Sequence, residues 1–188
     1  MSAVLQKRYL TEPDYLTQEA ESDIKHEYVD GDCYAMSGAS EKHNLITLNI
    51  AVPLRSAAKG STCRVFASDM KCRIENGRIY YYPDVMLVCQ QSDNADYYKQ
   101  QPCFIAEVQS KSTERVDRHE KWLVYSKIPS LRYYLLADSR QQKVDYFHRD
   151  DNGDWHSGVL ADGETLDITS DGDHASLSLA DIYEDVVF

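Results

Sequence analysis

Two short apolar runs constrain the fold of this chain more than any other feature. They are residues 85–89 (VMLVC) and 103–108 (CFIAEV), and only Glu107 interrupts the second. A strand that is apolar on both sides is buried on both faces, which requires further layers of structure above and below its sheet. Segments with helical patterns surround these runs and can form the layers. The sequence therefore predicts an α/β fold of the mixed α+β kind, with a central mixed sheet flanked by helices.

Four segments have the features of helices: 10–22, 40–59, 117–128 and 178–186. Thr11 and Ser40 are of the types preferred at helix N-caps, and Asp117 with Glu120 suggests a capping-box start for the third helix. Pro53 should kink the second helix, because it removes one backbone N–H group.

Strands are expected between these helices. Asp30–Gly31 predicts a tight β-hairpin, because a type I′ turn needs positive φ at both central residues. The remaining expected strand segments are 64–74, 78–88, 103–112, 132–138, 143–149 and a short strand near Leu166. No internal repeat or low-complexity segment is apparent.

Length and composition predict one globular domain over residues 1–188. The chain has 188 residues, of which 43% are apolar, and no apolar stretch approaches the roughly 20 residues of a membrane span. The first residues lack the apolar core of a secretory signal, so we expect a cytoplasmic protein without a membrane partner. Five scattered cysteines without CxxC spacing are interpreted as small apolar side chains rather than as a metal or redox site.

The negative charge is concentrated at one end of the chain. Residues 150–188 contain eleven Asp or Glu and no Lys or Arg, which equals the formal net charge of −11. We interpret this acidic C-terminal extension as a solvated surface. The neutral body, with a mildly basic segment at 99–149, is compatible with a phosphate-binding face but does not by itself indicate one.

Two carboxylates lie where a charge needs compensation. Asp84 precedes one apolar strand and Glu107 lies inside the other. Burying a charge costs several kcal/mol unless it is compensated, and a divalent cation shared by the two acids would compensate both. Alternatively, Asp84 ends a strand and Glu107 pairs with Arg115 or Arg118. Pattern alone does not choose between these alternatives.

Several motifs, in order, resemble the family known as "putative restriction endonuclease" within the PD-(D/E)XK nuclease superfamily. They are Tyr82-Pro83-Asp84-Val85, Ala106-Glu107-Val108, Ser110-x-Ser112-Thr113-Glu114 and Asp117-Arg118-x-x-Lys121, with similar stretches at 26–40, 63–75 and 178–188. The resemblance implies a restriction-endonuclease-like fold. It implies that Asp84 and Glu107 bind Mg²⁺ or Mn²⁺, and we add the carbonyl of Val108 as a third ligand.

One position departs from the superfamily pattern, because Gln109 stands where ExK has lysine. Two lysines could substitute. Lys111 shares a strand face with Glu107, and Lys121 shares a helix stripe with Val124, Tyr125 and Ile128. We expect Lys121 to be the catalytic lysine, oriented towards a reacting water. Glu27, on the first hairpin, is a candidate outer ligand, and His43 could contact phosphate or a carboxylate.

Together these features predict a Mg²⁺- or Mn²⁺-dependent deoxyribonuclease, which would be a homodimer if it cuts both strands. The alternative is a catalytically degraded nuclease-fold module that binds nucleic acid or protein. Gln109 and the net charge of −11 favour this alternative.

Overall fold

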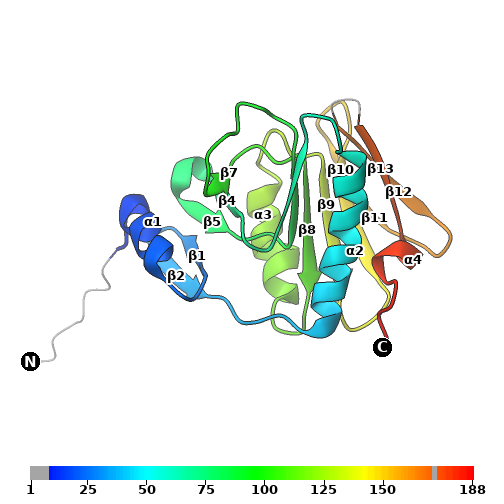
Figure 1. Ribbon diagram of the computed structural model, residues 1–188, viewed down its shortest axis with the longest axis horizontal. Coiled ribbons are helices and arrows are strands. Elements are labelled where there is room, and N and C mark those ends of the chain that lie inside the picture. Colours follow the sequence, from blue (N-terminus) through cyan, green and yellow to red (C-terminus); the bar gives the residue numbers. More distant parts are fainter. Residues whose placement is uncertain (1–8, 171–172) are drawn as a thin grey trace, which may run out of the picture.

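A six-stranded mixed sheet lies at the centre of the molecule (Figure 1). The structure is a computed structural model that describes residues 9–170 and 173–188. Its elements in chain order are α1 (Glu12–Glu21), β1 (His26–Val29), β2 (Asp32–Ala35), α2 (Glu41–Ala57), β3 (Arg64–Ala67), β4 (Lys71–Ile74), η1 (Glu75–Gly77), β5 (Ile79–Tyr81), β6 (Val85–Val88), β7 (Tyr98–Lys99), β8 (Phe104–Gln109), η2 (Val116–Lys121), α3 (Trp122–Tyr125), β9 (Tyr133–Asp138), β10 (Val144–Arg149), β11 (Trp155–Val159), β12 (Thr165–Ser170), β13 (Asp173–Ser178) and α4 (Leu179–Ile182).

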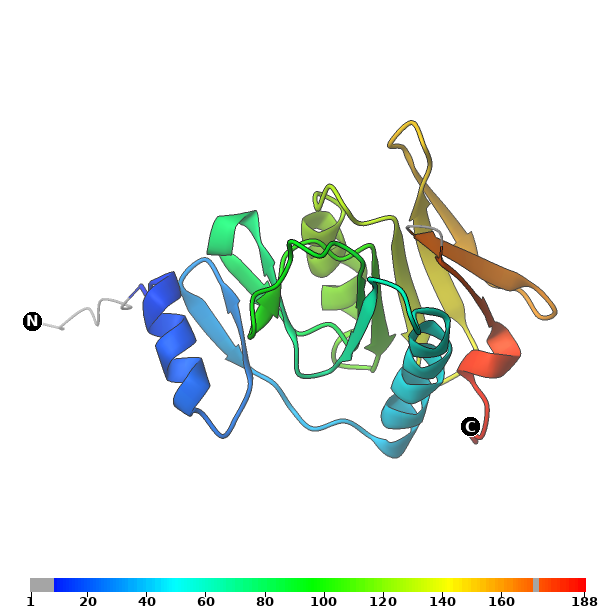
Figure 2. The ribbon, with the colours of Figure 1, turned by 45° about the horizontal axis from the view of Figure 1, so that its top comes forward.

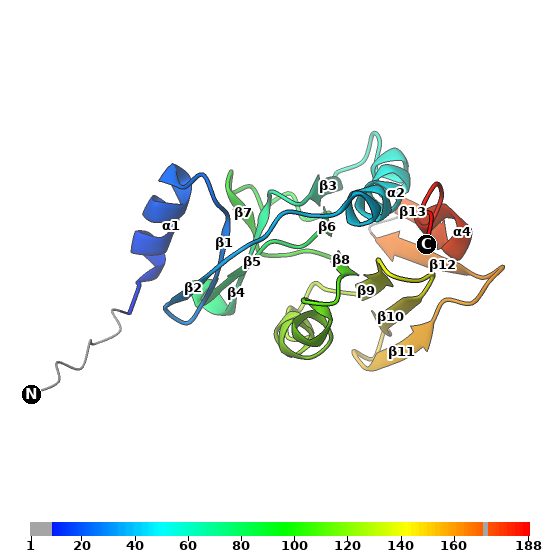
Figure 3. The same ribbon diagram turned by 90° about the horizontal axis from the view of Figure 1, so that it is seen from below.

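The central sheet has the strand order β11-β10-β9-β8-β6-β3. β8 runs parallel to β9 and antiparallel to β6, so the sheet is mixed, as predicted. Helix α2 lies on one side of the strands, and the helix formed by η2 and α3 lies on the other (Figure 3). The two apolar runs are the neighbouring strands β6 and β8, and both are completely buried.

Alternation along β8 decides which layer each side chain meets. Phe104, Ala106 and Val108 belong to the apolar cluster that includes α2. Ile105 belongs to the opposite cluster, which includes Tyr125 of α3. Glu107, two residues after Ile105, therefore faces the η2–α3 layer.

A second sheet, in the order β2-β1-β5-β4-β7, lies with α1 at the N-terminal end of the molecule (Figures 1 and 2). The expectation of continuous strands over 64–74 and 78–88 is wrong. Each segment forms two strands, one in the central sheet and one in the second sheet. The first break falls at Ser68, where φ is 58°, and the second at Pro83, which has no N–H to donate to a ladder. Asp84 lies directly after this second crossing.

The predicted first hairpin and the first two helices are confirmed. Asp30 and Gly31 both have positive φ, at 49° and 93°. Thr11 caps α1 and Ser40 caps α2, and α2 continues through Pro53. The third helix differs from the prediction, because it includes the π-helical segment η2 and Asp117 is buried within it rather than at its cap.

The acidic extension is part of the core, which corrects its interpretation as a solvated surface. Beyond residue 150 the chain adds β11, the hairpin β12–β13 and α4. α2 contacts both β13 and α4. The buried apolar residues of the extension are Leu160, Leu166, Ile168, Ala175, Leu177, Ile182, Tyr183 and Val186. Its acidic side chains therefore lie on a segment that is anchored by apolar ones.

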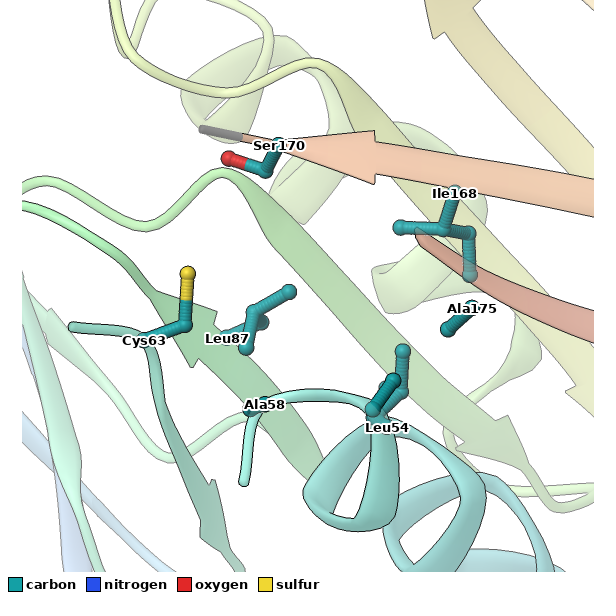
Figure 4. A pocket seen from close by; sticks show the side chains of 8 residues that line it. Leu54, Ala58, Cys63, Leu87, Ile168, Ser170 and Ala175 are labelled. Atoms are coloured by element: carbon teal, nitrogen blue, oxygen red, sulfur yellow. The ribbon is translucent and has the colours of Figure 1, made fainter. Parts of the chain in front are cut away.

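The packing between α2 and the β12–β13 hairpin is nearly complete. It leaves a cavity of about 10 Å³, lined by side chains that include Leu54, Cys63, Leu87 and Ile168 (Figure 4). A space of this size holds at most about one water molecule, so it is too small for a substrate. The α2 side of the sheet is core.

Cysteine pairing also differs from the expectation. Cys63 and Cys89 form a disulfide between the chain before β3 and the chain after β6. Cys103, at the start of β8, has its Sγ 3.7 Å from Sγ of Cys89. Cys63 and Cys89 are thus bonded to each other and are not simply small apolar side chains. Within the described residues, no helix is long and apolar enough to cross a membrane.

Candidate active site

Asp84 links the beginning of β6 to the end of β8. Its Oδ2 accepts a hydrogen bond of 2.7 Å from the backbone N–H of Val108, which lies two residues beyond Ala106, the partner of Val85 at the start of β6. Nε2 of His43, in the first turn of α2, lies 3.3 Å from the same oxygen. Oδ1 takes no hydrogen bond from the described part of the chain. One oxygen of Asp84 is therefore held by the protein and the other is available.

Glu107 is almost fully buried, with 3% of its surface exposed. Its Oε1 accepts hydrogen bonds from Nζ of Lys121 at 3.1 Å and from the hydroxyl of Tyr125 at 3.0 Å. Oε2 receives no hydrogen bond from the described residues. The alternative in which Glu107 pairs with an arginine is wrong, because Arg115 pairs with Glu120 and Arg118 pairs with Asp145.

Lys121 lies at the centre of the acidic side chains. Besides Glu107, its Nζ is 2.9 Å from Oε1 of Glu27 on β1 and 3.4 Å from Oδ1 of Asp117. The ammonium also lies 5.3 Å from the ring centroid of Tyr81. The structure thus confirms that Lys121 faces the interior, and it brings Glu27 into the same cluster.

Burial and the neighbouring charges change the ionisation of the cluster. Burial raises the pKa of Glu107 well above its usual value, with Lys121 opposing the shift and Asp117 and Asp84 adding to it. Burial also raises the pKa of Asp117. Burial alone would lower the pKa of Lys121, but the surrounding carboxylates outweigh it and raise that pKa. The lysine therefore remains an ammonium, while the acids are crowded together.

The carboxylate of Asp84 also shifts the pKa of His43. Burial alone would lower the pKa of His43, but the carboxylate of Asp84 raises it overall. Its place in the first turn of α2 follows from the cap, because Ser40 Oγ accepts the backbone N–H of His43. The sequence suggested His43 as a partner of phosphate or of a carboxylate, and the structure places it against the carboxylate.

The oxygens that remain are suitable for a hard divalent cation. Asp84 Oδ1 and Glu107 Oε2 receive no hydrogen bond from residues 9–170 or 173–188. The carbonyl of Val108 points to the same side of β8 as its N–H, which donates to Asp84. Mg²⁺ prefers oxygen ligands and is commonly held by one or two carboxylates together with water and substrate. Among the described residues, no three Asp, Glu, His or Cys side chains form a ready cage for a metal. The donor set fits an open site of two carboxylates.

The two other predicted positions lie at the edge of this arrangement. Gln109 is buried, and its side-chain amide donates to the carbonyl of Glu114 while its oxygen accepts from Arg118. Lys111 lies in the turn after β8 with an exposed side chain, because the strand ends at Gln109. Lys111 therefore does not enter the cluster.

Sequence reasoning missed Asp117 and Tyr125 as members of the site. Both lie four residues from Lys121, so the three side chains follow one face of the helix. That spacing was visible in the sequence. Asp117 was left out of the predicted site because it was interpreted as the cap of the third helix.

Comparisons with known proteins identify the family to which the chain is similar. The model of the family described as "Putative restriction endonuclease" (Uma2) matches residues 12–179. "Uncharacterized protein slr1290" of Synechocystis sp. is 34% identical over 180 residues, covering 95% of this chain and 94% of that protein. "Uncharacterized protein sll1609" of the same organism is 32% identical over 158 residues, covering 82% and 89%.

A solved structure has the same fold. It is described as that of "a putative nuclease belonging to DUF820" from Anabaena variabilis. The TM-score is 0.75 at 17% sequence identity, and the match covers 94% of this chain and 99% of the other. The predicted restriction-endonuclease-like fold is confirmed.

Proposed function

We propose that this protein, which belongs to the "Putative restriction endonuclease" family, is a nuclease that uses a divalent cation to hydrolyse phosphodiester bonds in DNA. One observation supports this most strongly. Glu27, Glu107 and Asp117 surround a single ammonium within 3.4 Å, and Asp84 is hydrogen-bonded to the residue after Glu107. Burying more negative than positive charge lowers the stability of the folded protein unless a bound cation compensates the excess.

Asp84 Oδ1, Glu107 Oε2 and the carbonyl of Val108 would hold Mg²⁺ or Mn²⁺. The bound ion supplies stabilisation of charge on the phosphate oxygens and a lowered pKa for water. The protein groups fix the ligands. The N–H of Val108 and His43 hold Asp84, while Tyr125 and Lys121 hold Glu107.

Lys121 contributes a fixed positive charge beside the reacting phosphate in this proposal. Its position is set from several sides, by carboxylates of β1, β8 and its own helix. A preorganised charge of this kind lowers the barrier without reorganisation during the reaction. Gln109 is not needed for this role, since the ammonium enters from the helix instead of from the strand.

Cleavage of supercoiled plasmid DNA tests the proposal. Wild type should nick or linearise the plasmid with Mg²⁺ or Mn²⁺ and should be inactive in EDTA. Asp84→Ala should be inactive with either ion. Glu120→Gln is the matched control, because Glu120 is an acid next to the same helix residues but is half exposed and paired with Arg115. Metal binding without cleavage of any nucleic acid would instead favour the alternative of a degraded binding module.

A further inference from the structure

The Lys121 ammonium lies among three carboxylates, which are the type of ligand that hard divalent cations prefer. Three carboxylate oxygens surround Nζ, from Glu27 at 2.9 Å, Glu107 at 3.1 Å and Asp117 at 3.4 Å. The contact with Glu107 is a directed hydrogen bond, whereas those with Glu27 and Asp117 are ion pairs. The ammonium is therefore held by charge from three sides rather than aimed at a water molecule, which was the role expected from the sequence. Lys121 acts here as a charge.

The size of this cage suits an ammonium rather than a metal. Mg²⁺ binds oxygen at about 2.0–2.1 Å and Ca²⁺ at about 2.3–2.6 Å, whereas the three oxygens lie near 3 Å from Nζ. Glu27 Oε1 is buried and faces the ammonium without a directed hydrogen bond. The carboxylates would have to move inward by about 1 Å to bind a metal at the same centre.

Glu107 joins this cage to the proposed cation site. Its Oε1 belongs to the cage and its Oε2 is left for the divalent ion. A carboxylate shared in this way is the arrangement of two-metal sites, in which the ions lie about 3.5–4 Å apart. In this protein one of the two positions is taken by the side chain of Lys121.

We propose that the Lys121 ammonium takes the place of a second divalent cation, so that the native site binds one metal ion. Removal of that side chain then opens a second cation site on Glu27, Glu107 and Asp117. This inference rests on the proposed function, because it assumes the first ion on Asp84 and Glu107. The inference concerns only how many divalent ions the native protein binds, so it can be wrong while the proposed function is correct.

Calorimetric titration with Mn²⁺ counts the ions on folded protein. Wild type should bind one Mn²⁺, and Lys121→Ala should bind two. Lys121→Met is the matched control, because it removes the same charge but fills the cage with an apolar stem, and it should not bind a second ion. Glu27→Gln in the Lys121→Ala background should return the count to one, since Glu27 is outside the first site.

Thermal unfolding keeps the test independent of how well the variant folds without metal. Lys121→Ala leaves three buried carboxylates uncompensated, so its melting temperature in EDTA should fall below that of wild type. Mn²⁺ should raise the melting temperature of this variant more than that of wild type. A variant that stays unfolded in saturating Mn²⁺ would overturn the inference, because the ion should replace the ammonium.

The outcomes separate the two proposals. One ion on wild type and two on Lys121→Ala support both. One ion on each, or two on wild type, overturns the inference and leaves the proposed function intact. No ion on wild type overturns the proposed function and the inference with it.

Discussion

Gln109 stands where the superfamily pattern has lysine, and its neighbours show why a lysine there would fit poorly. The buried amide bonds both the carbonyl of Glu114 and the guanidinium of Arg118. An ammonium could keep the first contact but would face Arg118 with the same charge. We predict that Gln109→Lys lowers the free energy of unfolding by about 1–3 kcal/mol, the typical cost of an unsatisfied or repelled buried polar group.

Urea unfolding measures this cost, and plasmid cleavage by the double variant Gln109→Lys with Lys121→Ala measures its functional side. We expect no rescue of cleavage, because the ammonium at 109 would lie beside Arg118 rather than among the carboxylates. Recovery of cleavage in the double variant would show that the strand position can replace the helix position.

Glu107→Gln should stabilise the metal-free protein at neutral pH. Burial raises the pKa of Glu107, so the folded state carries the cost of its ionised form. This cost is absent below about pH 4, near the ordinary pKa of glutamate, grows as pH rises from there to the raised pKa, and is constant above it. Gln can still accept hydrogen bonds from Lys121 and Tyr125, so the contacts of Oε1 survive the change.

Thermal unfolding in EDTA from pH 4 to pH 8 checks this prediction. The advantage of Glu107→Gln over wild type should be smallest at pH 4 and should grow as the pH rises. Glu120→Gln, on an exposed acid, should show little change across it. An advantage that is largest at pH 4 would mean that desolvation of Glu107 has been misjudged.

At the scale of elements, the sequence located the central strands and most helices but not the sheet to which each strand belongs. The apolar runs that form β6 and β8 were predictable, because short runs of this composition are typical of strands buried on both faces. The breaks at Ser68 and Pro83 are local, yet their effect is to move the chain between sheets. The alternation of side chains along these segments is the same in either sheet, so it does not predict where the chain crosses from one sheet to the other.

The site shows the same division between local and long-range information. Alternation placed Glu107 on its face and helical spacing turned Lys121 inward, so both were predictable. Asp84 with the N–H of Val108 and Glu27 with Lys121 are contacts between distant segments. The family resemblance identified these residues as candidates. Their pairing could not be predicted from local sequence patterns.

The disulfide gives an element-scale prediction. Cys63–Cys89 joins the ends of the antiparallel strands β3 and β6, and the two cysteines are separated by 26 positions in sequence. Replacing both cysteines with alanine should lower the free energy of unfolding by about 2–4 kcal/mol. Urea unfolding with and without reductant measures it. Equal stability of oxidised wild type, reduced wild type and the double variant would contradict the bond.

For the whole molecule, the acidic extension should be required for folding. Eight of its apolar residues are in the core, and Tyr183 donates hydrogen bonds to the carbonyls of Asp138 and Lys143. Each buried large aliphatic side chain contributes about 1.5–3 kcal/mol, and a domain is stable by about 5–15 kcal/mol in total. A chain that ends at residue 149 should therefore lack a cooperative thermal transition by circular dichroism. A cooperative transition near that of the full chain would mean that the extension is an appendage.

The central claim is that Asp84 and Glu107 together hold one divalent cation. It is tested most directly by the Mn²⁺ affinity of Asp84→Asn and Glu107→Gln, each measured by calorimetry against wild type and against Glu120→Gln. Because each substitution replaces one of the two carboxylates, we predict that both weaken Mn²⁺ binding at least tenfold and that Glu120→Gln does not. Wild-type affinity in both variants would contradict the account.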